Sequence, residues 1–184
     1  MRIRCAVVSD TGTARSTNED NYLVGTRFAT NLTERECYRE TLQKSNIVAV
    51  CDGLGGHQCG KEAAAMAVKS MAEYSTRLKN SRITSVEERL EHLIQEVNQD
   101  VVSIQSQNTR SGTTLAMAYF ARKKIYLANV GDSRIYIFKD RELSCLSYDH
   151  NRLQELLEIT REDSAEIKLK GPNGLTQYIG IDPN

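Results

Sequence analysis

Apolar residues near the start of the chain alternate with polar ones. Ile3, Cys5 and Val7 share one side of this pattern, which predicts a strand over residues 2–9. A polar stretch follows, and a second short strand is expected at residues 22–24. The chain therefore opens with strands rather than with a helix.

Residues 47–50 are an unbroken apolar run, typical of a strand covered on both faces. Asp52 stands at its end and is followed by a cluster of glycines, Gly53, Gly55, Gly56 and Gly60. A buried and unpaired carboxylate would be costly, so we expect Asp52 to meet a cation, a metal ion or solvent. The polar residues 26–45 before this strand fit either a hairpin extension or a mobile flap.

The period changes to that of a helix after the glycine cluster. One apolar stripe runs along Ala64, Ala67, Val68, Met71 and Leu78. Ser85 and Glu88 then form a capping box that predicts the start of a second helix. The stripe of this helix comprises Val86, Leu90, Leu93, Ile94, Val97, Val101 and Ile104. Two such stripes indicate an antiparallel helix pair packed over a sheet.

Strand patterns return after Gly112 with short connections, which predicts an antiparallel meander. Its strands are expected at residues 113–120, 125–130, 134–138 and 142–147. A short helix is expected at residues 152–158 and one more strand at residues 175–179. Strands, two helices and further strands in this order favour an α+β fold over a doubly wound parallel one.

Composition narrows the class of protein. A chain of 184 residues suits one domain, and equal numbers of basic and acidic residues, 24 each, argue against a nucleic-acid partner. Apolar runs are too short for a membrane span or a signal peptide. The five cysteines are scattered without a CxxC pair, which favours a reducing, cytoplasmic location over disulfides or a zinc site.

Acidic residues occur at strand ends or tight turns in three places, namely Glu19 with Asp20, Asp52, and Asp132. Hard divalent cations prefer oxygen ligands, and two such ions can activate water and hold a phosphoryl group. Arg15 lies near in sequence and suits bidentate phosphate binding. Each acid alone is more often a turn-capping or surface residue, but together they indicate a metal-assisted phosphoryl-transfer site.

An alternative is a nucleotide-binding P-loop, because residues 55–61 match its Gly-x-x-x-x-Gly-Lys spacing. A P-loop needs Ser or Thr next, and this chain has Glu62, whose carboxylate would repel phosphates. The antiparallel pattern of the second half also disfavours it. The P-loop remains a remote alternative.

The chain resembles the PP2C (PPM) family of metal-dependent serine/threonine protein phosphatases, in its bacterial form. The motifs that carry the resemblance are residues 15–20 (RSTNED), 50–57 (VCDGLGGH), 111–114 (SGTT), 128–134 (ANVGDSR), 148–150 (YDH) and 175–180. They occur in the family's order across nearly the whole chain.

The resemblance implies a sandwich of two antiparallel β-sheets flanked by helix pairs. It also implies a protein serine/threonine phosphatase that hydrolyses phosphoserine and phosphothreonine with water activated at a two-metal centre of Mn²⁺ or Mg²⁺. By the same resemblance Asp52 would bridge the ions, the Gly53 carbonyl would bind one, and Asp20 would support the site beside Glu19. Arg15 would hold the substrate phosphate, and Asp132 would help to form a third, weaker metal site. The implied partners are phosphorylated Ser/Thr proteins and a cognate serine/threonine kinase, without nucleic acid or membrane.

Two features depart from the family pattern. The family's histidine after the Asp-Gly pair is replaced by Leu54, so His57 could protonate the leaving group or only stabilise the glycine loop. The later Ser-Asp-Gly and Asp-Asn segments, which would supply further metal ligands, have no counterpart here. We therefore expect residues 1–184 to be a single PP2C-like domain lacking its C-terminal part, either as a fragment of a longer phosphatase or as a diverged form with a depleted site. We expect this chain to be weakly active or inactive alone, and the alternative function is a non-catalytic interaction module.

Overall fold

A central antiparallel sheet organises the structure. The computed structural model describes residues 2–30, 35–43, 46–55, 57–77, 85–106, 111–121, 123–160 and 174–182. Five strands follow the order β3-β2-β5-β8-β9, and every neighbouring pair is antiparallel. Their bounds are β2 Asn21–Val24, β3 Arg27–Phe28, β5 Asn46–Cys51, β8 Leu115–Ala121 and β9 Lys124–Val130.

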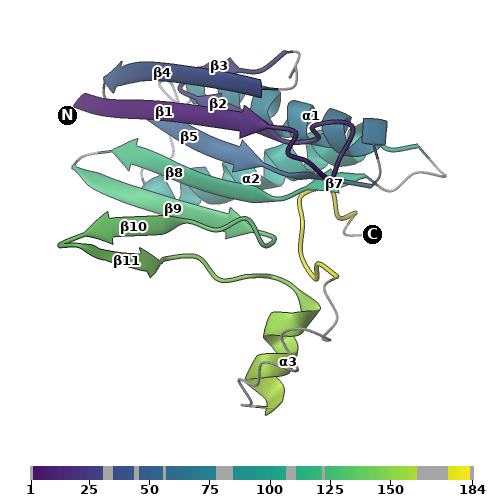
Figure 1. The fold of residues 1–184 in the computed structure, drawn as a ribbon. Helices are drawn as coiled ribbons and strands as arrows, with labels where there is room; N and C mark the ends of the chain where they lie inside the picture. Colours follow the sequence, from purple (N-terminus) through teal and green to yellow (C-terminus); the bar gives the residue numbers. More distant parts are fainter. Residues whose placement is uncertain are drawn as a thin grey trace.

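Two long helices, α1 (His57–Arg77) and α2 (Val86–Ser103), cover one face of this sheet (Figure 1). Alternate residues of β5, among them Ile47 and Ala49, point into the same core as the apolar stripes of the helices. Each fully buried aliphatic side chain contributes about 1.5–3 kcal/mol, so this layer supplies most of the hydrophobic stabilisation. The described residues of the two helical stripes are confirmed as core except Ile104, which lies just after α2 and is 36% exposed.

The helices run antiparallel, as expected from the sequence. Ser70 of α1 donates to Asp100 near the end of α2, whereas Tyr74, further along α1, donates to the Arg89 carbonyl near the start of α2. The predicted cap at Ser85 is confirmed, because its hydroxyl accepts from the Glu88 amide at 3.0 Å. Leu78 and the connection between the helices lie outside the described residues. None of the helices that the structure describes is both long and apolar enough to cross a membrane.

Two further pairs of strands lie outside the central sheet, and the first of them packs on its opposite face. β1 (Arg2–Asp10) pairs along its whole length with β4 (Arg35–Gln43). Ile3, Cys5 and Val7 of β1 pack on a second apolar cluster that includes Tyr22. The second pair is β10 (Tyr136–Lys139) with β11 (Glu142–Cys145). β6 (Gly53–Leu54) and β7 (Gly112–Thr113) form a further small sheet beside α1.

A groove of about 430 Å³ separates β1 from the segment that leads into β10. Its floor includes residues 48–50 of β5 and 116–118 of β8. Val50 is 48% exposed there, so the prediction that this strand is covered on both faces is wrong at its end. The α+β sandwich of antiparallel sheets is confirmed, with β1 and β4 packed as a second layer on the central sheet in the described part of the chain.

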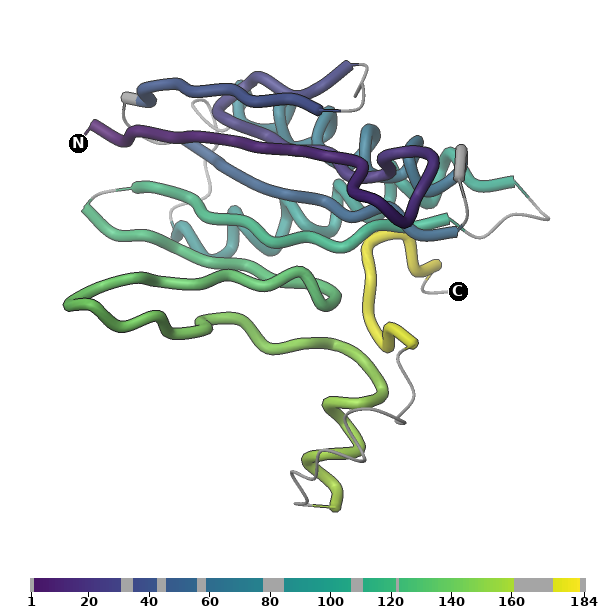
Figure 2. Tube along the Cα trace, viewed as in Figure 1, coloured from purple at the N-terminus to yellow at the C-terminus, as the bar shows by residue number. Residues whose placement is uncertain are grey.

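The structure decides one open alternative and corrects two other sequence predictions. The undecided residues 26–45 contain β3 and β4, so the hairpin alternative fits the described part of that segment. The expected meander breaks after β9, because Gly131 adopts φ +97° and turns the chain out of the central sheet (Figure 2). Residues 175–179 form only isolated bridges, Asn151 with Leu175 and Thr113 with Ile179, instead of a strand.

The expected short helix at residues 152–158 is present as α3 (Arg152–Thr160), which extends away from the sheets (Figure 1). The antiparallel order around β5 lacks the parallel strand–helix–strand unit that a P-loop requires. That alternative is therefore not supported.

Candidate metal and phosphate site

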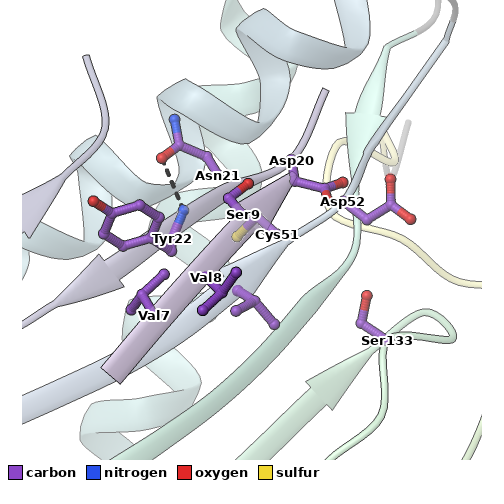
Figure 3. Close-up of a pocket in the computed structure, with 10 residues that line it drawn as sticks. Val7, Val8, Ser9, Asp20, Asn21, Tyr22, Cys51, Asp52 and Ser133 are labelled. Atoms are coloured by element: carbon purple, nitrogen blue, oxygen red, sulfur yellow. Dashed lines mark hydrogen bonds between the residues drawn. The ribbon is translucent and has the colours of Figure 1, made fainter. Parts of the chain in front are cut away.

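Antiparallel pairing of β2 with β5 brings Asp20 and Asp52 together. Asn21 stands opposite Cys51 in the ladder, so Asp20, just before β2, faces Asp52, just after β5. The two carboxyl groups lie within hydrogen-bonding reach of each other. Figure 3 shows both side chains directed into the same space at the end of the sheet. Asp20 and Asp52 therefore line the same space.

The pair is electrostatically strained. Partial burial raises the pKa of Asp20 from its ordinary 3.8 to about 6, and the charge of Asp52, its hydrogen bond and the charge of Glu19 act in the same direction. No ion pair among the described residues involves Asp20 or Asp52. A cation bound between the carboxylates would relieve this repulsion, so the donor set fits a divalent ion.

Two hollows meet at these carboxylates. The first, of about 200 Å³, is lined by Arg15, Glu19, Asp20, Asp52 and Gly53, together with residues 10–11 and 17–18. The second, of about 180 Å³, lies beside β1 and is lined by Asp20, Asp52, Ser9, Cys51 and Ser133 among others. Ser133 reaches this space from the turn after β9 (Figure 3). Asp20 and Asp52 thus form the wall between a polar hollow and a mixed one.

Arg15 and Glu19 belong to the polar hollow. Arg15 Nη1 lies 4.0 Å from Glu19 Oε1, and the arginine side chain is 75% exposed. Its guanidinium is therefore available to an anion from solvent while Glu19 holds it near the carboxylate pair. Both residues thus line the same hollow as Asp20 and Asp52.

A close backbone contact fixes the turn after Asp52. A Cβ atom on Gly53 would lie 2.2 Å from the carbonyl oxygen of Gly60, in the first turn of α1. A Cβ atom on Gly60 would lie 2.4 Å from Glu19 Oε2 and 2.9 Å from the Gly53 carbonyl carbon. These two glycines let the turn, the helix and Glu19 approach one another.

The side chain of Asn18 links the backbone of Asp20 to the end of β1 through two hydrogen bonds. Its side-chain amide donates to Ser9 Oγ at 2.8 Å, and its side-chain oxygen accepts from the Asp20 amide at 3.0 Å. The end of β1 is thereby tied to the acidic segment. Asn18 and Ser9 were not singled out from the sequence, although an Asn two residues before a site carboxylate is a typical Asx-turn signal.

Asp132 lies in the turn after β9, outside the linings of both hollows. Partial burial is the largest cause that raises its pKa, and the charges of Asp149 and Asp52 add to it. Arg134 holds Asp149 through two nitrogens, with Nη2 2.6 Å from Oδ2 and Nε 2.9 Å from Oδ1. The Gly131 amide donates to His150 Nδ1 at 3.1 Å. These bonds fix the turn that carries Asp132.

Sequence reasoning gave no role to several residues that hold the site in place. Thr113 and Thr114 belong to a quoted motif, but only the structure shows them bonded to the backbone of Asp52. The side chain of His57 lies outside the described residues, so its role stays a prediction. Among the described residues, no group of three His, Cys, Asp or Glu side chains is arranged to hold a metal ion. The site roles of Arg15, Glu19, Asp20, Asp52, Gly53 and Asp132 also remain predictions.

Comparison with known proteins gives one consistent family. The family description "Protein phosphatase 2C" matches residues 7–170. The serine/threonine phosphatase stp of Listeria monocytogenes is 34% identical over 182 residues, which cover 95% of this chain and 66% of that protein. This chain thus spans just under two thirds of the length of that relative.

Solved structures show the same fold. The S. agalactiae serine/threonine phosphatase superposes with a TM-score of 0.75 at 23% identity, over 100% of this chain and 71% of that one. The catalytic domain of the serine/threonine protein phosphatase PstP, in complex with 2 manganese ions, gives a TM-score of 0.66 at 21% identity, over 98% and 73% of the two chains. Both likenesses concern the arrangement of sheets and helices.

Proposed function

Since the chain belongs to the protein phosphatase 2C family, we propose that it acts in metal-dependent hydrolysis of phosphoserine and phosphothreonine in proteins. The observation that carries this proposal is the Asp20–Asp52 pair, which lacks a cationic partner among the described residues and opens into a hollow that also contains Arg15. A carboxylate pair beside a solvent-accessible guanidinium suits a divalent ion and a phosphoryl group side by side.

The residues that would hold Mn²⁺ or Mg²⁺ are Asp52, Asp20, Glu19 and the Gly53 carbonyl, with Asp132 nearby for a further ion. Hard cations of this kind keep several waters and need only a few carboxylates from the protein. When bound, such ions would activate water for attack and neutralise phosphoryl charge. PstP with its manganese ions supports this choice of metal.

The chain's own residues would position the substrate. Arg15 would bind the phosphate oxygens in bidentate fashion, and Glu19 would keep the guanidinium over the hollow. Because the pKa of Asp20 stands at about 6 without metal, an ion bound between the carboxylates would displace the proton that Asp20 holds below that pH. Most of the catalytic effect would come from positioning and charge neutralisation.

Cys51 argues against a thiol-based phosphatase mechanism at this site. Burial, the largest cause, raises the pKa of its thiol to about 12, and the side chain is 1% exposed. A thiol with that pKa is protonated at neutral pH and cannot act as the nucleophile. The buried Cys51 thiol is therefore unsuited to act as a nucleophile, which agrees with the proposed attack by water.

The test is release of phosphate from a phosphothreonine peptide with Mn²⁺, with and without a chelator. Asp52→Asn should abolish the chelator-sensitive rate, and Arg15→Ala should raise KM about tenfold or more with a smaller change in kcat. Matched controls are Asp140→Asn, an 85% exposed carboxylate, and Arg77→Ala at the far end of α1; both should behave as wild type. A rate that survives chelation or Asp52→Asn would reject the mechanism.

A second candidate is a non-catalytic interaction module. It is favoured by the lack of a three-residue metal group among the described residues. Calorimetric titration with Mn²⁺ separates the two proposals, because the enzyme requires saturable binding and the module does not.

The phosphatase proposal also includes phosphorylated proteins as substrates, a cognate kinase as partner and a cytoplasmic location. The location is supported by the five free cysteines.

A further inference from the structure

Thr114 forms hydrogen bonds with both the amide and the carbonyl group of Asp52. It stands between β7 and β8 and is 2% exposed. Its amide donates to the Asp52 carbonyl at 2.9 Å, and its hydroxyl oxygen accepts from the Asp52 amide at 3.0 Å. Neighbouring Thr113 donates its hydroxyl to the same carbonyl at 3.0 Å. The direction in which Asp52 leaves β5 is thus set by a buried threonine pair.

The same Thr114 hydroxyl reaches the turn that carries Asp132. Its oxygen lies 2.6 Å from Ser133 Oγ. Because this oxygen already accepts a proton from the Asp52 amide, its own proton is available for Ser133. The methyl group of Thr114 contacts the other side of the turn, since a Cβ atom on Gly131 would lie 2.7 Å from Thr114 Cγ2. Both branches of the side chain are therefore used.

Thr114 cannot touch a substrate directly. It is buried, and it is absent from the described residues that line the two hollows beside Asp20. Ser133, by contrast, lines the hollow that Asp20 and Asp52 share. Any effect of Thr114 on the site must pass through Asp52 and through the turn of residues 131–133.

We propose that Thr114 is a positioning residue that couples the Asp52 turn to the Asp132 turn, so that one buried hydroxyl sets the spacing of carboxylates from two different strand ends. This inference rests on the proposed metal-dependent function of the same site. Partners of metal ligands commonly contribute 10–100-fold to metal affinity by fixing ligand orientation. The hydroxyl of Thr114 is a partner of this kind, because it bonds to the backbone of Asp52 and to Ser133 next to Asp132.

The test compares Thr114→Val, Thr114→Ser and Ser133→Ala with wild type by Mn²⁺ calorimetry, and by hydrogen exchange of the Asp52 amide in metal-free protein. Thr114→Val keeps the shape but loses the hydroxyl, so the Mn²⁺ dissociation constant should rise about tenfold or more and the Asp52 amide should exchange faster. Thr114→Ser keeps the hydroxyl and should restore most of both. Ser133→Ala should weaken Mn²⁺ binding while leaving the Asp52 amide protected.

The double variant Thr114→Val/Ser133→Ala should bind Mn²⁺ no more weakly than Thr114→Val alone, because both changes break one chain of bonds. The control Thr76→Val removes an exposed hydroxyl that donates to the Glu73 carbonyl in α1 and should leave both measurements unchanged. If Thr114→Val proves too unstable to study, Ser133→Ala and Thr114→Ser carry the test.

Wild-type Mn²⁺ affinity in Thr114→Val or in Ser133→Ala would overturn the inference and leave the proposed function standing. Strictly additive effects in the double variant would also overturn it. Failure of the unsubstituted protein to bind Mn²⁺ would instead reject the proposed function. The metal-free exchange rates of Thr114→Val and Thr114→Ser would then show whether the hydroxyl still fixes the Asp52 turn.

Discussion

Asp20 and Asp52 extend from adjacent antiparallel strands and bring their carboxyl groups within hydrogen-bonding reach. Burial and the neighbouring charge raise the pKa of Asp20 to about 6. In the metal-free protein, a negative charge on both carboxyl groups is therefore less favourable than a charge on one of them. Such an arrangement sacrifices some stability of the empty site for affinity toward a cation.

Replacing one acid should therefore stabilise the metal-free protein. In Asp52→Asn the repulsion disappears, while the backbone bonds to Thr114 remain possible. We expect the free energy of unfolding in chelator to rise by up to about 1 kcal/mol, after allowing for the solvent exposure of both groups. Urea denaturation measures it, and a loss of stability in chelator would contradict the view that the pair is strained.

The pH dependence of stability follows from the same pKa. The unfolded chain releases the Asp20 proton near its ordinary 3.8, whereas the folded chain holds it until about 6. Folding then takes up a proton between these values, so stability should fall as pH rises through that window in the metal-free protein. Asp132, whose pKa is also raised, acts in the same direction.

Urea midpoints at pH values between about 4.5 and 7, with chelator present, measure this slope. Asp20→Asn should flatten it. Mn²⁺ affinity should show the opposite trend and weaken as pH falls below about 6, because the proton competes with the ion for Asp20. Equal slopes in wild type and Asp20→Asn would show that another group is responsible.

The Arg134–Asp149 pair should respond unequally to loss of its two partners. Asp149 is 9% exposed in its side chain and Arg134 is 52% exposed. Arg134→Ala leaves a buried carboxylate without its ion pair and should cost about 2–3 kcal/mol, whereas Asp149→Asn leaves an arginine that water can reach and should cost about 1 kcal/mol. Thermal or urea unfolding measures both, and a larger loss in Asp149→Asn would refute the asymmetry.

Gly60 should tolerate alanine poorly although it lies in a helix. Alanine favours a helix by about 1 kcal/mol over glycine, but the added Cβ would lie 2.9 Å from the Gly53 carbonyl carbon. Overpacking of this kind costs about 1–3 kcal/mol, so we expect a net loss of stability and weaker Mn²⁺ binding through displacement of Gly53. Gly174→Ala, whose nearest neighbours stand 3.9 Å away, is the matched control and should stay within about 0.5 kcal/mol of wild type.

Local patterns were sufficient to predict most elements of the fold. The alternation of Ile3, Cys5 and Val7 identified β1, and the capping box at Ser85 identified the start of α2 within a residue. The strand-end positions of Asp20 and Asp52 also indicated that the two acids could meet. These features depend on side-chain periodicity and on strand ends, which one sequence records directly.

Relations between distant segments could not be predicted in this way. The residues near Gly131 in sequence do not predict that the chain leaves the central sheet there. The turn depends on the φ of +97° at Gly131 and on contact with Thr114, which is distant in sequence. The tail at residues 175–179 has strand-like composition, but its partners Asn151 and Thr113 offer only single bridges. Bonds from Thr114 to Asp52 join residues 62 apart in sequence, a relation that no local pattern reports.

The groove between β1 and β10 has a practical consequence for experiments on this chain. Val50 and other apolar atoms on its floor remain open to water in the native state. Dyes such as ANS, whose fluorescence is often taken as a sign of a molten or partly unfolded chain, should find a binding surface here in the intact fold. Strong fluorescence from such a dye would therefore not by itself indicate a partly unfolded chain. Loss of the near-ultraviolet circular dichroism signal would be needed to show lost side-chain packing.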